Sequence, residues 1–246
     1  MEAGTLAILC AAAFATAVLS AVVGLAGGIT LLAVMLLFFE PLVVLPVHGV
    51  IQLVSNLSRT WFQRRHVETG ILRWFAVWMI PTSIVGLWIG SALPAEALKV
   101  AIGVFVLLAT WRPRWLLLGI DPTTIDPRRR FLALGGCVGF LNMTVGATGP
   151  FAAPFFLNTG LSRYALVGTK AATQALGHTI KVVLFALAGF AFSDFALPLV
   201  ALCACVVLGS FVGSKLLDRV SERAFELLYR VVLTAIAFRL LLSAGQ

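Results

Sequence analysis

The sequence contains the stretch Val-Gly-Leu-Ala-Gly-Gly at residues 23–28 and a related stretch, Val-Gly-Ala-Thr-Gly-Pro, at residues 145–150. Each stretch interrupts an apolar segment, and the register between the two copies then continues without a gap. The matching polar positions downstream are Gln52 and Gln174, Asn56 and His178, and Arg59 and Lys181. The chain is therefore the product of a duplication.

A second set of small residues repeats further along each copy. Gly86, Gly90 and Ser91 match Gly209, Gly213 and Ser214 with one residue of slip. Helices interrupted at matching positions of two halves point to the binding site of a transporter. Small residues also let membrane helices pack closely, which is the alternative explanation for the glycines. We favour a binding site at residues 23–28 and 145–150 because the interruptions are paired.

The composition predicts an all-α integral membrane protein. Of the 246 residues, 61% are hydrophobic and 11% are charged, and the mean hydropathy is +1.04. Apolar runs close to the roughly 20 residues needed to cross a bilayer recur from end to end. The formal net charge is +8, but the basic residues lie mainly between the apolar runs, as they do in cytoplasmic loops. The expected partner is thus the lipid bilayer and not a nucleic acid.

The apolar segments divide into two sets of five around a linker. They lie near residues 5–24, 28–39, 43–61, 72–93 and 96–111, and near 131–146, 150–159, 163–190, 194–217 and 222–243. The linker at 112–130 contains prolines and five arginines, so it separates repeat 1 (residues 1–111) from repeat 2 (residues 131–246). The second segment of each copy is short, and it either completes a hairpin or enters the membrane part-way and returns.

Loop charges predict that the two copies are inserted in opposite orientations. The basic loop 62–71 corresponds to loop 187–194, which has no Lys or Arg, whereas the loop 91–96 without positive charge corresponds to the basic loop 214–222. Lys and Arg are retained at the cytoplasmic face. The predicted cytoplasmic segments are 62–71, 112–130 and 214–222, and the predicted outside segments are 40–43, 91–96 and 187–194. Both termini are then outside, and the two glycine-rich turns meet near the midplane of the membrane.

These turns are suited to binding an anion. A helix that starts after a break exposes backbone N–H groups without partners, and its dipole places partial positive charge there. Gly27, Gly28 and Gly149 allow a ligand to approach the backbone, and Thr30 and Thr148 add hydroxyl donors. We therefore predict that these five residues bind the substrate.

Polar residues follow each turn at helical spacing. Gln52 and Asn56 share one helix face, as do Gln174 and His178. An amide can donate to an anion without holding it too tightly for release. Buried amides also stabilise contacts between membrane helices, so substrate binding and helix packing both remain open for these residues.

Charged groups inside apolar spans are costly and usually functional. We predict that Lys181 contacts the substrate and that His48, Lys170 and His178 form a proton or charge relay, which makes coupling to H⁺ possible. Either lysine could instead extend its ammonium group to the membrane surface. The acidic residues fall at segment ends or in loops. A positive interior without a carboxylate favours an anionic substrate over a cation.

The cysteines predict neither a disulfide nor a metal site. Cys10, Cys137, Cys203 and Cys205 all lie in apolar runs without C-x-x-C spacing, and buried free thiols behave as small hydrophobic groups. No cofactor is expected.

Three motifs in order carry a resemblance to a known family. They are Gly-Leu-Ala-Gly-Gly at 24–28, the basic loop with His66 and Gly70 ahead of Trp74, and Gly-Leu-Trp-Ile-Gly-Ser at 86–91. Together they resemble the TauE/SafE family of membrane transporters, also called the sulfite exporter or TSUP family. The resemblance covers nearly the whole chain. It implies a bacterial or archaeal inner-membrane protein that moves sulfite, sulfoacetate or related organosulfonates.

The chain departs from the pattern of that family at Gly149-Pro150 and at Thr169-Lys170. The second departure could alter the size or charge of the preferred substrate. The sequence therefore predicts a secondary transporter of small, sulfur-containing anions that works by alternating access.

Two other functions were weighed. An anion channel or uniporter would use the same helix-terminus site. A membrane-embedded enzyme would need Ser55 or Ser58 as a nucleophile with His48 or His178 as a base, but no motif supplies the acidic partner, so an enzyme is not expected. A homo-oligomer is compatible with the sequence.

Overall fold

The computed structural model describes residues 2–23, 27–216 and 222–243, and these ranges contain helices but no strand. The first copy forms α1 (Ala3–Val23), α2 (Gly27–Met35), α3 (Pro41–Phe62), the 3₁₀ turn η1 (Arg64–His66), α4 (Thr69–Ala92) and α5 (Ala95–Trp111). The linker contains η2 (Trp115–Leu117) and η3 (Pro122–Thr124). The second copy forms α6 (Pro127–Thr144), α7 (Gly149–Ala152), η4 (Ala153–Phe156), α8 (Arg163–Leu187), η5 (Phe192–Phe195), α9 (Ala196–Leu216) and α10 (Glu222–Ser243). The predicted all-α class is confirmed.

Several helices are long and apolar enough to cross a membrane. Within the described ranges they span Ala3–Val22, Pro41–Phe62, Thr69–Ala92 and Phe192–Leu216. On α4 the buried residues recur every three or four positions in a single stripe, while large apolar side chains such as Trp78 and Trp88 are exposed. Apolar surface of this kind is stable against lipid and not against water. The protein is a multi-pass membrane protein.

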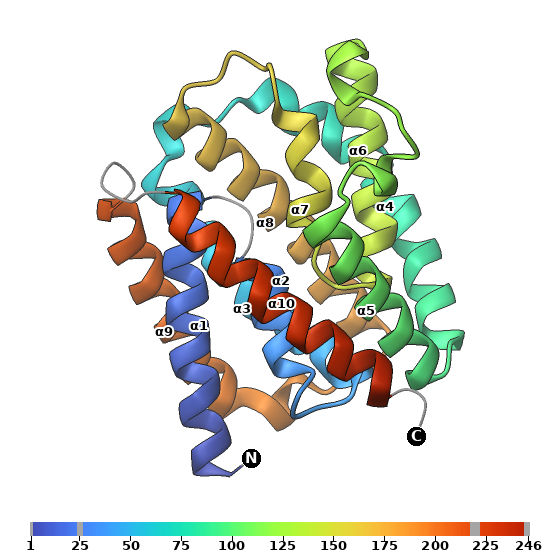
Figure 1. The fold of residues 1–246 in the computed structure, drawn as a ribbon, viewed down its shortest axis with the longest axis vertical. Coiled ribbons are helices and arrows are strands. Elements are labelled where there is room, and N and C mark those ends of the chain that lie inside the picture. Colours follow the sequence, from blue (N-terminus) through green and yellow to red (C-terminus); the bar gives the residue numbers. More distant parts are fainter. Residues whose placement is uncertain (1, 24–26, 217–221, 244–246) are drawn as a thin grey trace.

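The second segment of each copy does not cross. The nine residues of α2 extend about 14 Å as a helix, against roughly 30 Å of bilayer hydrocarbon. Figure 1 shows that α1 rises from the lower end of the molecule and α2 returns toward that end, whereas α6 descends from the upper end and α7 returns upward. In both pairs a long helix is thus followed by a short one that runs back only part of the way.

The second copy has a shorter returning helix than expected. The segment predicted at 150–159 forms four α-helical residues in α7 and then the 3₁₀ turn η4. Pro154 explains the change, because it has no N–H to donate and its ring clashes with the carbonyl of the preceding turn.

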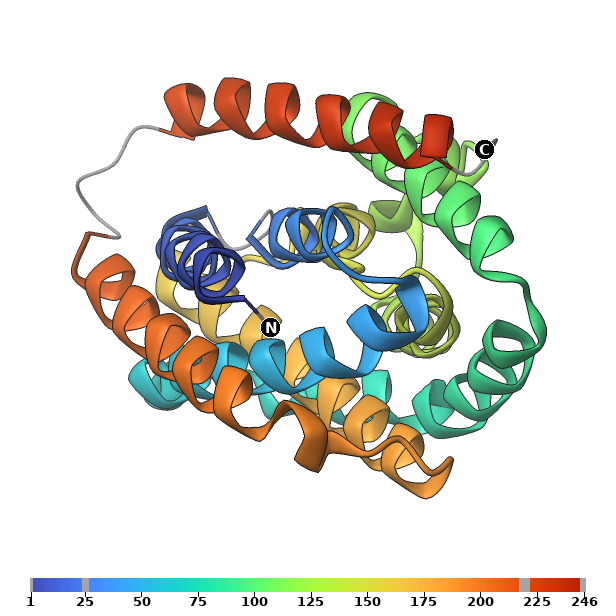
Figure 2. The same cartoon turned by 90° about the horizontal axis from the view of Figure 1, so that it is seen from below.

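Helix contacts between the copies are reciprocal. The helix α1 packs against α9, and its counterpart α6 packs against α4, which is the counterpart of α9. The counterparts α3 and α8 pack on each other, and so do α5 and α10. In Figure 2 the half-length α2 lies inside an outer layer that includes α4, α5, α9 and α10. Duplication explains this pattern of contacts, and the opposite orientation of the copies remains a prediction that the two hairpins support.

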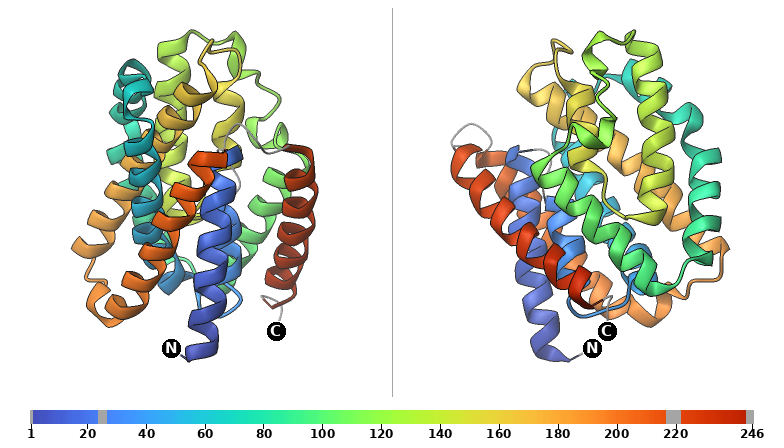
Figure 3. Two further views of the ribbon diagram at one scale, coloured as in Figure 1. Left: turned by 90° about the vertical axis from the view of Figure 1, so that its left-hand side faces the viewer. Right: turned by 45° about the vertical axis from the view of Figure 1, so that its right-hand side comes forward.

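The loops divide between two ends of the molecule. We call the end where α6 and α8 begin the upper end, and the end where α1 begins and α10 finishes the lower end (Figure 3). The loop 62–71 lies at the upper end and the linker 112–130 leads to it, while 40–43, 91–96 and 187–194 lie at the lower end. Most of the loop predicted at 214–222 lies outside the described residues. Cytoplasmic placement of the upper end is still a prediction from charge.

Glycines bring the paired helices into backbone contact. A Cβ added at Gly86 of α4 would lie 2.7 Å from the Phe140 carbonyl oxygen of α6, and one at Gly209 of α9 would lie 2.4 Å from the Phe14 carbonyl oxygen of α1. Such approaches are possible only without a side chain. The repeated glycines at 86–90 and 209–213 therefore serve helix packing.

Adjacent glycines on α6 allow a direct test of this packing. A Cβ at Gly135 would lie 1.9 Å from the Phe75 carbonyl oxygen of α4, whereas at Gly136 the nearest atom would be 3.5 Å away. We expect Gly135→Ala to lower the free energy of unfolding in detergent by about 1–3 kcal/mol or more, because α4 must move away. Gly136→Ala should stay within about 1 kcal/mol of wild type, since alanine favours the helix. Equal effects of the two substitutions would contradict this assignment.

Candidate functional site

The starts of α2 and α7 meet in one small cavity between α3, α6 and α8. Its volume is about 20 Å³, which is room for about one water molecule. The polar and glycine positions that line it are Gly28, His48, Gln52, Asn142, Thr148, Gly149, Gln174, Gly177 and His178. We call this the central cavity. It joins residues from both copies of the duplication.

Seven of the predicted site residues line the central cavity, and five do not. Gly28, His48, Gln52, Thr148, Gly149, Gln174 and His178 line it, whereas Gly27, Thr30, Asn56, Lys170 and Lys181 lie outside it. The residues outside are nevertheless buried. Two of them contact residues at the cavity wall or beside it: Asn56 donates to the Gln52 carbonyl oxygen and Lys181 to the Gly146 carbonyl oxygen.

The break between α6 and α7 depends on glycine at position 146. Its φ angle is +86°, in the left-handed region that favours glycine. The N–H groups of Val145 and Gly146 both donate to the Leu141 carbonyl, which closes the end of α6. A Cβ at Gly146 would also lie 2.5 Å from a methyl carbon of Leu45 in α3. Backbone conformation and space thus both require glycine.

Lys181 holds this break in place from α8. Its Nζ donates to the Gly146 carbonyl oxygen at 3.0 Å, and its side chain is fully buried. The side chain passes over Gly49 of α3, where a Cβ would lie 2.9 Å from Lys181 Cδ. Lys181 therefore does not extend to the membrane surface, and it positions the turn that carries Thr148 and Gly149.

Arg59 has the matching role in the first copy. Its guanidinium donates to the Ser20 carbonyl oxygen of α1 at 3.0 Å and to Asn56 Oδ1. Asn56 in turn donates to the Gln52 carbonyl oxygen at 2.7 Å. The amide of Asn56 is thus occupied with α3 itself and with Arg59. The glycine-rich residues 24–26 of the first copy lie outside the described residues.

The interior is positively charged. In the described part of the chain every buried Asp, Glu, Lys or Arg side chain is a cation: Arg59, Arg130, Lys170 or Lys181. The one ion pair among the described residues, between Lys99 and Glu40, is partly exposed and lies away from the cavity. Of the buried cations, Arg59 and Lys181 donate to backbone carbonyl oxygens, and buried positive charge of this kind favours an anion over a cation nearby.

Two histidines stand side by side in the central cavity. The rings of His48 and His178 are 5.9 Å apart between centroids and nearly perpendicular. His48 Nε2 lies 2.8 Å from the Gly28 carbonyl oxygen, and because a carbonyl only accepts, this nitrogen carries a proton. The Nδ1 atoms of both rings are buried without a hydrogen-bond partner. They are the groups in the site whose hydrogen-bonding role changes with protonation.

The dipole of a helix start contributes unequally in the two copies. The helix α2 has nine residues, enough to carry a partial positive charge at Gly27 and Gly28. The helix α7 has four, so its dipole is much weaker. In the second copy the side chains of Thr148 and Gln174 therefore offer the cavity stronger hydrogen-bond donors than the start of α7 does.

Sequence reasoning missed Asn142 and Gly177. Asn142 of α6 is buried, and its Oδ1 has no hydrogen-bond partner. Gly177 of α8 lies against it: a Cβ added at Gly177 would be 3.3 Å from the Asn142 amide nitrogen. Asn142 is a lone amide within an apolar segment, which is a signal that could have found it. Gly177 carries no such signal, because its role depends on what lies across from it.

Comparison with protein families gives one match over almost all of the chain. The family model described as "Sulfite exporter TauE/SafE" matches residues 9–240. No curated protein and no solved structure matches the chain. The matched range includes both hairpins and the central cavity.

The structure predicts different effects for two neighbouring amides on α3. Asn56→Ala removes an acceptor from buried Arg59, so we expect the free energy of unfolding to fall by about 1–3 kcal/mol. Asn56→Asp keeps the acceptor and should retain most of that stability. Gln52→Ala should have the smaller effect on stability, because Gln52 faces the cavity. Denaturant titration in detergent measures all three, and a wild-type value for Asn56→Ala would rule out this role.

Proposed function

The chain belongs to the sulfite exporter TauE/SafE family, and from this premise we propose that it is a secondary transporter of small sulfur-containing oxyanions or organosulfonates. Its family is a family of membrane transporters of sulfur anions, and its helices make it a multi-pass membrane protein. The observation that carries the proposal is a polar cavity inside the helix bundle, surrounded by buried cations and free of carboxylates in the part described.

The hydrogen-bonding groups of the central cavity fit an oxyanion. Gln52, Asn142 and Gln174 each offer amide N–H donors, and Thr148 offers a hydroxyl. Arg59 and Lys181 supply positive charge from behind the wall without a direct ionic contact. A site of this kind binds an anion by several neutral donors and releases it more readily than a direct salt bridge would.

The size of the cavity supports alternating access. A volume of about 20 Å³ holds about one water molecule, so a sulfur oxyanion enters only if the surrounding helices separate. The site lies between hairpins that enter from opposite ends (Figure 1). We propose that movement of one copy against the other opens the cavity to one membrane face at a time.

We propose that protons accompany the anion. An oxyanion only accepts hydrogen bonds, and a neutral His48 that donates to Gly28 presents a lone pair at Nδ1. Protonation of His48 converts its Nδ1 atom into a donor, and a protonated His178 donates from both of its ring nitrogens. The pair would then bind the anion and the proton together, which is the H⁺ coupling expected from the sequence.

Catalysis is a weaker explanation of the site. The Ser58 hydroxyl donates to the Val54 carbonyl oxygen, and the Ser55 hydroxyl lies 3.4 Å from that of Ser210. Neither serine lines the central cavity with the histidines.

Counterflow in proteoliposomes tests the carrier mechanism. Vesicles loaded with sulfite should take up radiolabelled sulfite faster than empty vesicles, because a carrier exchanges its substrate. Gln52→Ala and Gln174→Ala should each raise the KM for uptake about tenfold or more, the effect of a lost hydrogen bond to a charged ligand. Ser58→Ala, on the same helix as Gln52 but outside the cavity, is the control. Uptake without stimulation by internal sulfite would favour a channel.

A pH-sensitive dye inside the same vesicles tests proton coupling. An acidic exterior should drive accumulation of the anion together with acidification of the interior. His178→Asn keeps a polar side chain that cannot take up a proton, so anion movement should no longer carry protons. Proton influx that is unchanged in His178→Asn and in the corresponding His48→Asn would refute the coupling.

A further inference from the structure

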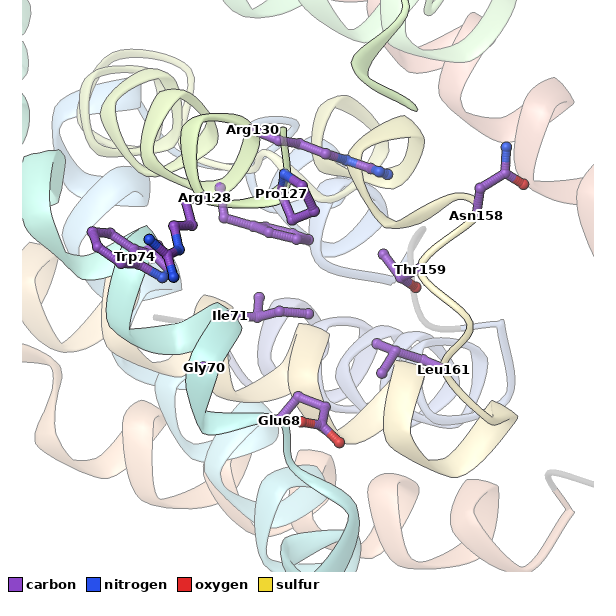
Figure 4. Close-up of a pocket in the computed structure, with 11 residues that line it drawn as sticks. Glu68, Gly70, Ile71, Trp74, Pro127, Arg128, Arg130, Asn158, Thr159 and Leu161 are labelled. Carbon is purple, nitrogen blue, oxygen red and sulfur yellow. The ribbon is translucent and has the colours of Figure 1, made fainter. Parts of the chain in front are cut away.

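A second and much larger cavity opens at the upper end of the molecule. It lies between the start of α4, the start of α6 and the chain between η4 and α8, and its volume is about 530 Å³ (Figure 4). Cavities of about 300–1,000 Å³ are typical of sites for small molecules. We call it the vestibule.

Two arginines from the first turn of α6 define one wall of the vestibule. The Arg130 side chain is only 4% exposed, and its guanidinium donates to the carbonyl oxygens of Pro154 and Leu157 while its Nε has no partner. Arg128 is exposed and lies 5.6 Å from the centroid of the Trp74 ring. Figure 4 shows both side chains at the edge of the same space, with Thr159 reaching into it. The wall presents donors and positive charge.

One acidic residue lines the vestibule opposite these arginines, and two more lie near them in the chain just before α6. Glu68, just before α4, lines the far side of the vestibule. Asp126 accepts the backbone N–H groups of Arg128 and Arg129. The pKa of Asp121 is lowered chiefly by the Thr123 backbone N–H and also by the charge of Arg130. The vestibule therefore contains both positive and negative side chains, and neutralising Glu68 would make its net charge more positive.

A line of contacts leads from the vestibule to the helix that lines the central cavity. Phe131 lines the vestibule, and its ring packs edge-on against Phe156 at 5.2 Å between centroids. Lys170 Nζ lies 5.4 Å from the centre of the Phe156 ring. One and two turns further along α8, on the same face, Gln174 and His178 line the central cavity. The two aromatic rings therefore lie between the two cavities.

We propose that the vestibule is a second anion-binding site, where Arg128 and Arg130 hold the transported anion before it passes Phe131 and Phe156. This inference rests on the proposed transport function. It assigns a role to Lys170 as the first cation beyond the aromatic pair. The ligand class is a small oxyanion or sulfonate, bound by guanidinium groups and by the Thr159 hydroxyl.

Two variants that change the charge of the vestibule in opposite directions test its role in sulfite uptake. Arg128→Gln should raise the KM about two- to fivefold and Glu68→Gln should lower it by a similar factor, the range expected for exposed charges. Arg129→Gln is the matched control, because it makes the same charge change on the neighbouring residue, which does not line the cavity. Higher ionic strength should shrink the effects of both vestibule variants.

Arg130→Gln should raise the KM as well, but it also removes hydrogen bonds to two carbonyl groups and so lowers stability. Arg128 and Glu68 are exposed, and their variants keep the test independent of folding. An equal KM shift in Arg128→Gln and Arg129→Gln would overturn the proposal that the vestibule binds the anion. So would an unchanged KM in both Arg128→Gln and Glu68→Gln.

A binding measurement separates the vestibule from transport itself. In protein whose four native cysteines are replaced by alanine, methanesulfonate should slow maleimide labelling of Thr159→Cys, with equal chloride as the comparison. Labelling of Leu118→Cys, an exposed linker position, should not change. Protection of Thr159→Cys in protein that transports no anion would leave the vestibule standing and refute the proposed function. Active transport without protection of Thr159→Cys would refute the vestibule as a binding site and leave the proposed function standing.

Discussion

A break in a helix inside a membrane leaves backbone groups that water cannot reach, and each of them needs a partner within the protein. This chain has two such breaks. The Gly146 carbonyl accepts from Lys181, and the Ser20 carbonyl at the end of α1 accepts from Arg59. Arg59 and Lys181, which satisfy these carbonyl groups, are therefore also two of the buried cations that make the interior positive.

Close helix contacts keep these partners in position. Glycines on α4, α6 and α9 let backbones approach until no side chain would fit between them, as the Phe75 carbonyl does at Gly135. Rigid contacts of this kind, between α1 and α9 and between α6 and α4, join each hairpin to a helix of the other copy. A relative movement of the copies would thus carry a hairpin with it, which is the motion that alternating access requires.

In the function that we propose, the two cavities have different parts in recognition. The central cavity is small, and residues of both copies line it, among them neutral donors and two histidines. The vestibule is open, and it presents guanidinium groups of which one is exposed. A charged, open site attracts an anion at long range, whereas a dry site of fixed donors discriminates between anions. Phe131 and Phe156 lie between these two environments.

The sequence alone predicted the helical class, the paired glycine-rich interruptions, the short second segments and seven of the residues that line the central cavity, because these follow from apolar length and from residues repeated in register. It also identified Gln52, Gln174 and His178 by their spacing on α3 and α8. Only the tertiary structure decided that Asn56 turns to Arg59, that Lys181 holds Gly146, and that Asn142 joins the site. Those outcomes depend on which buried group finds a partner across a helix contact, and a linear pattern does not specify that.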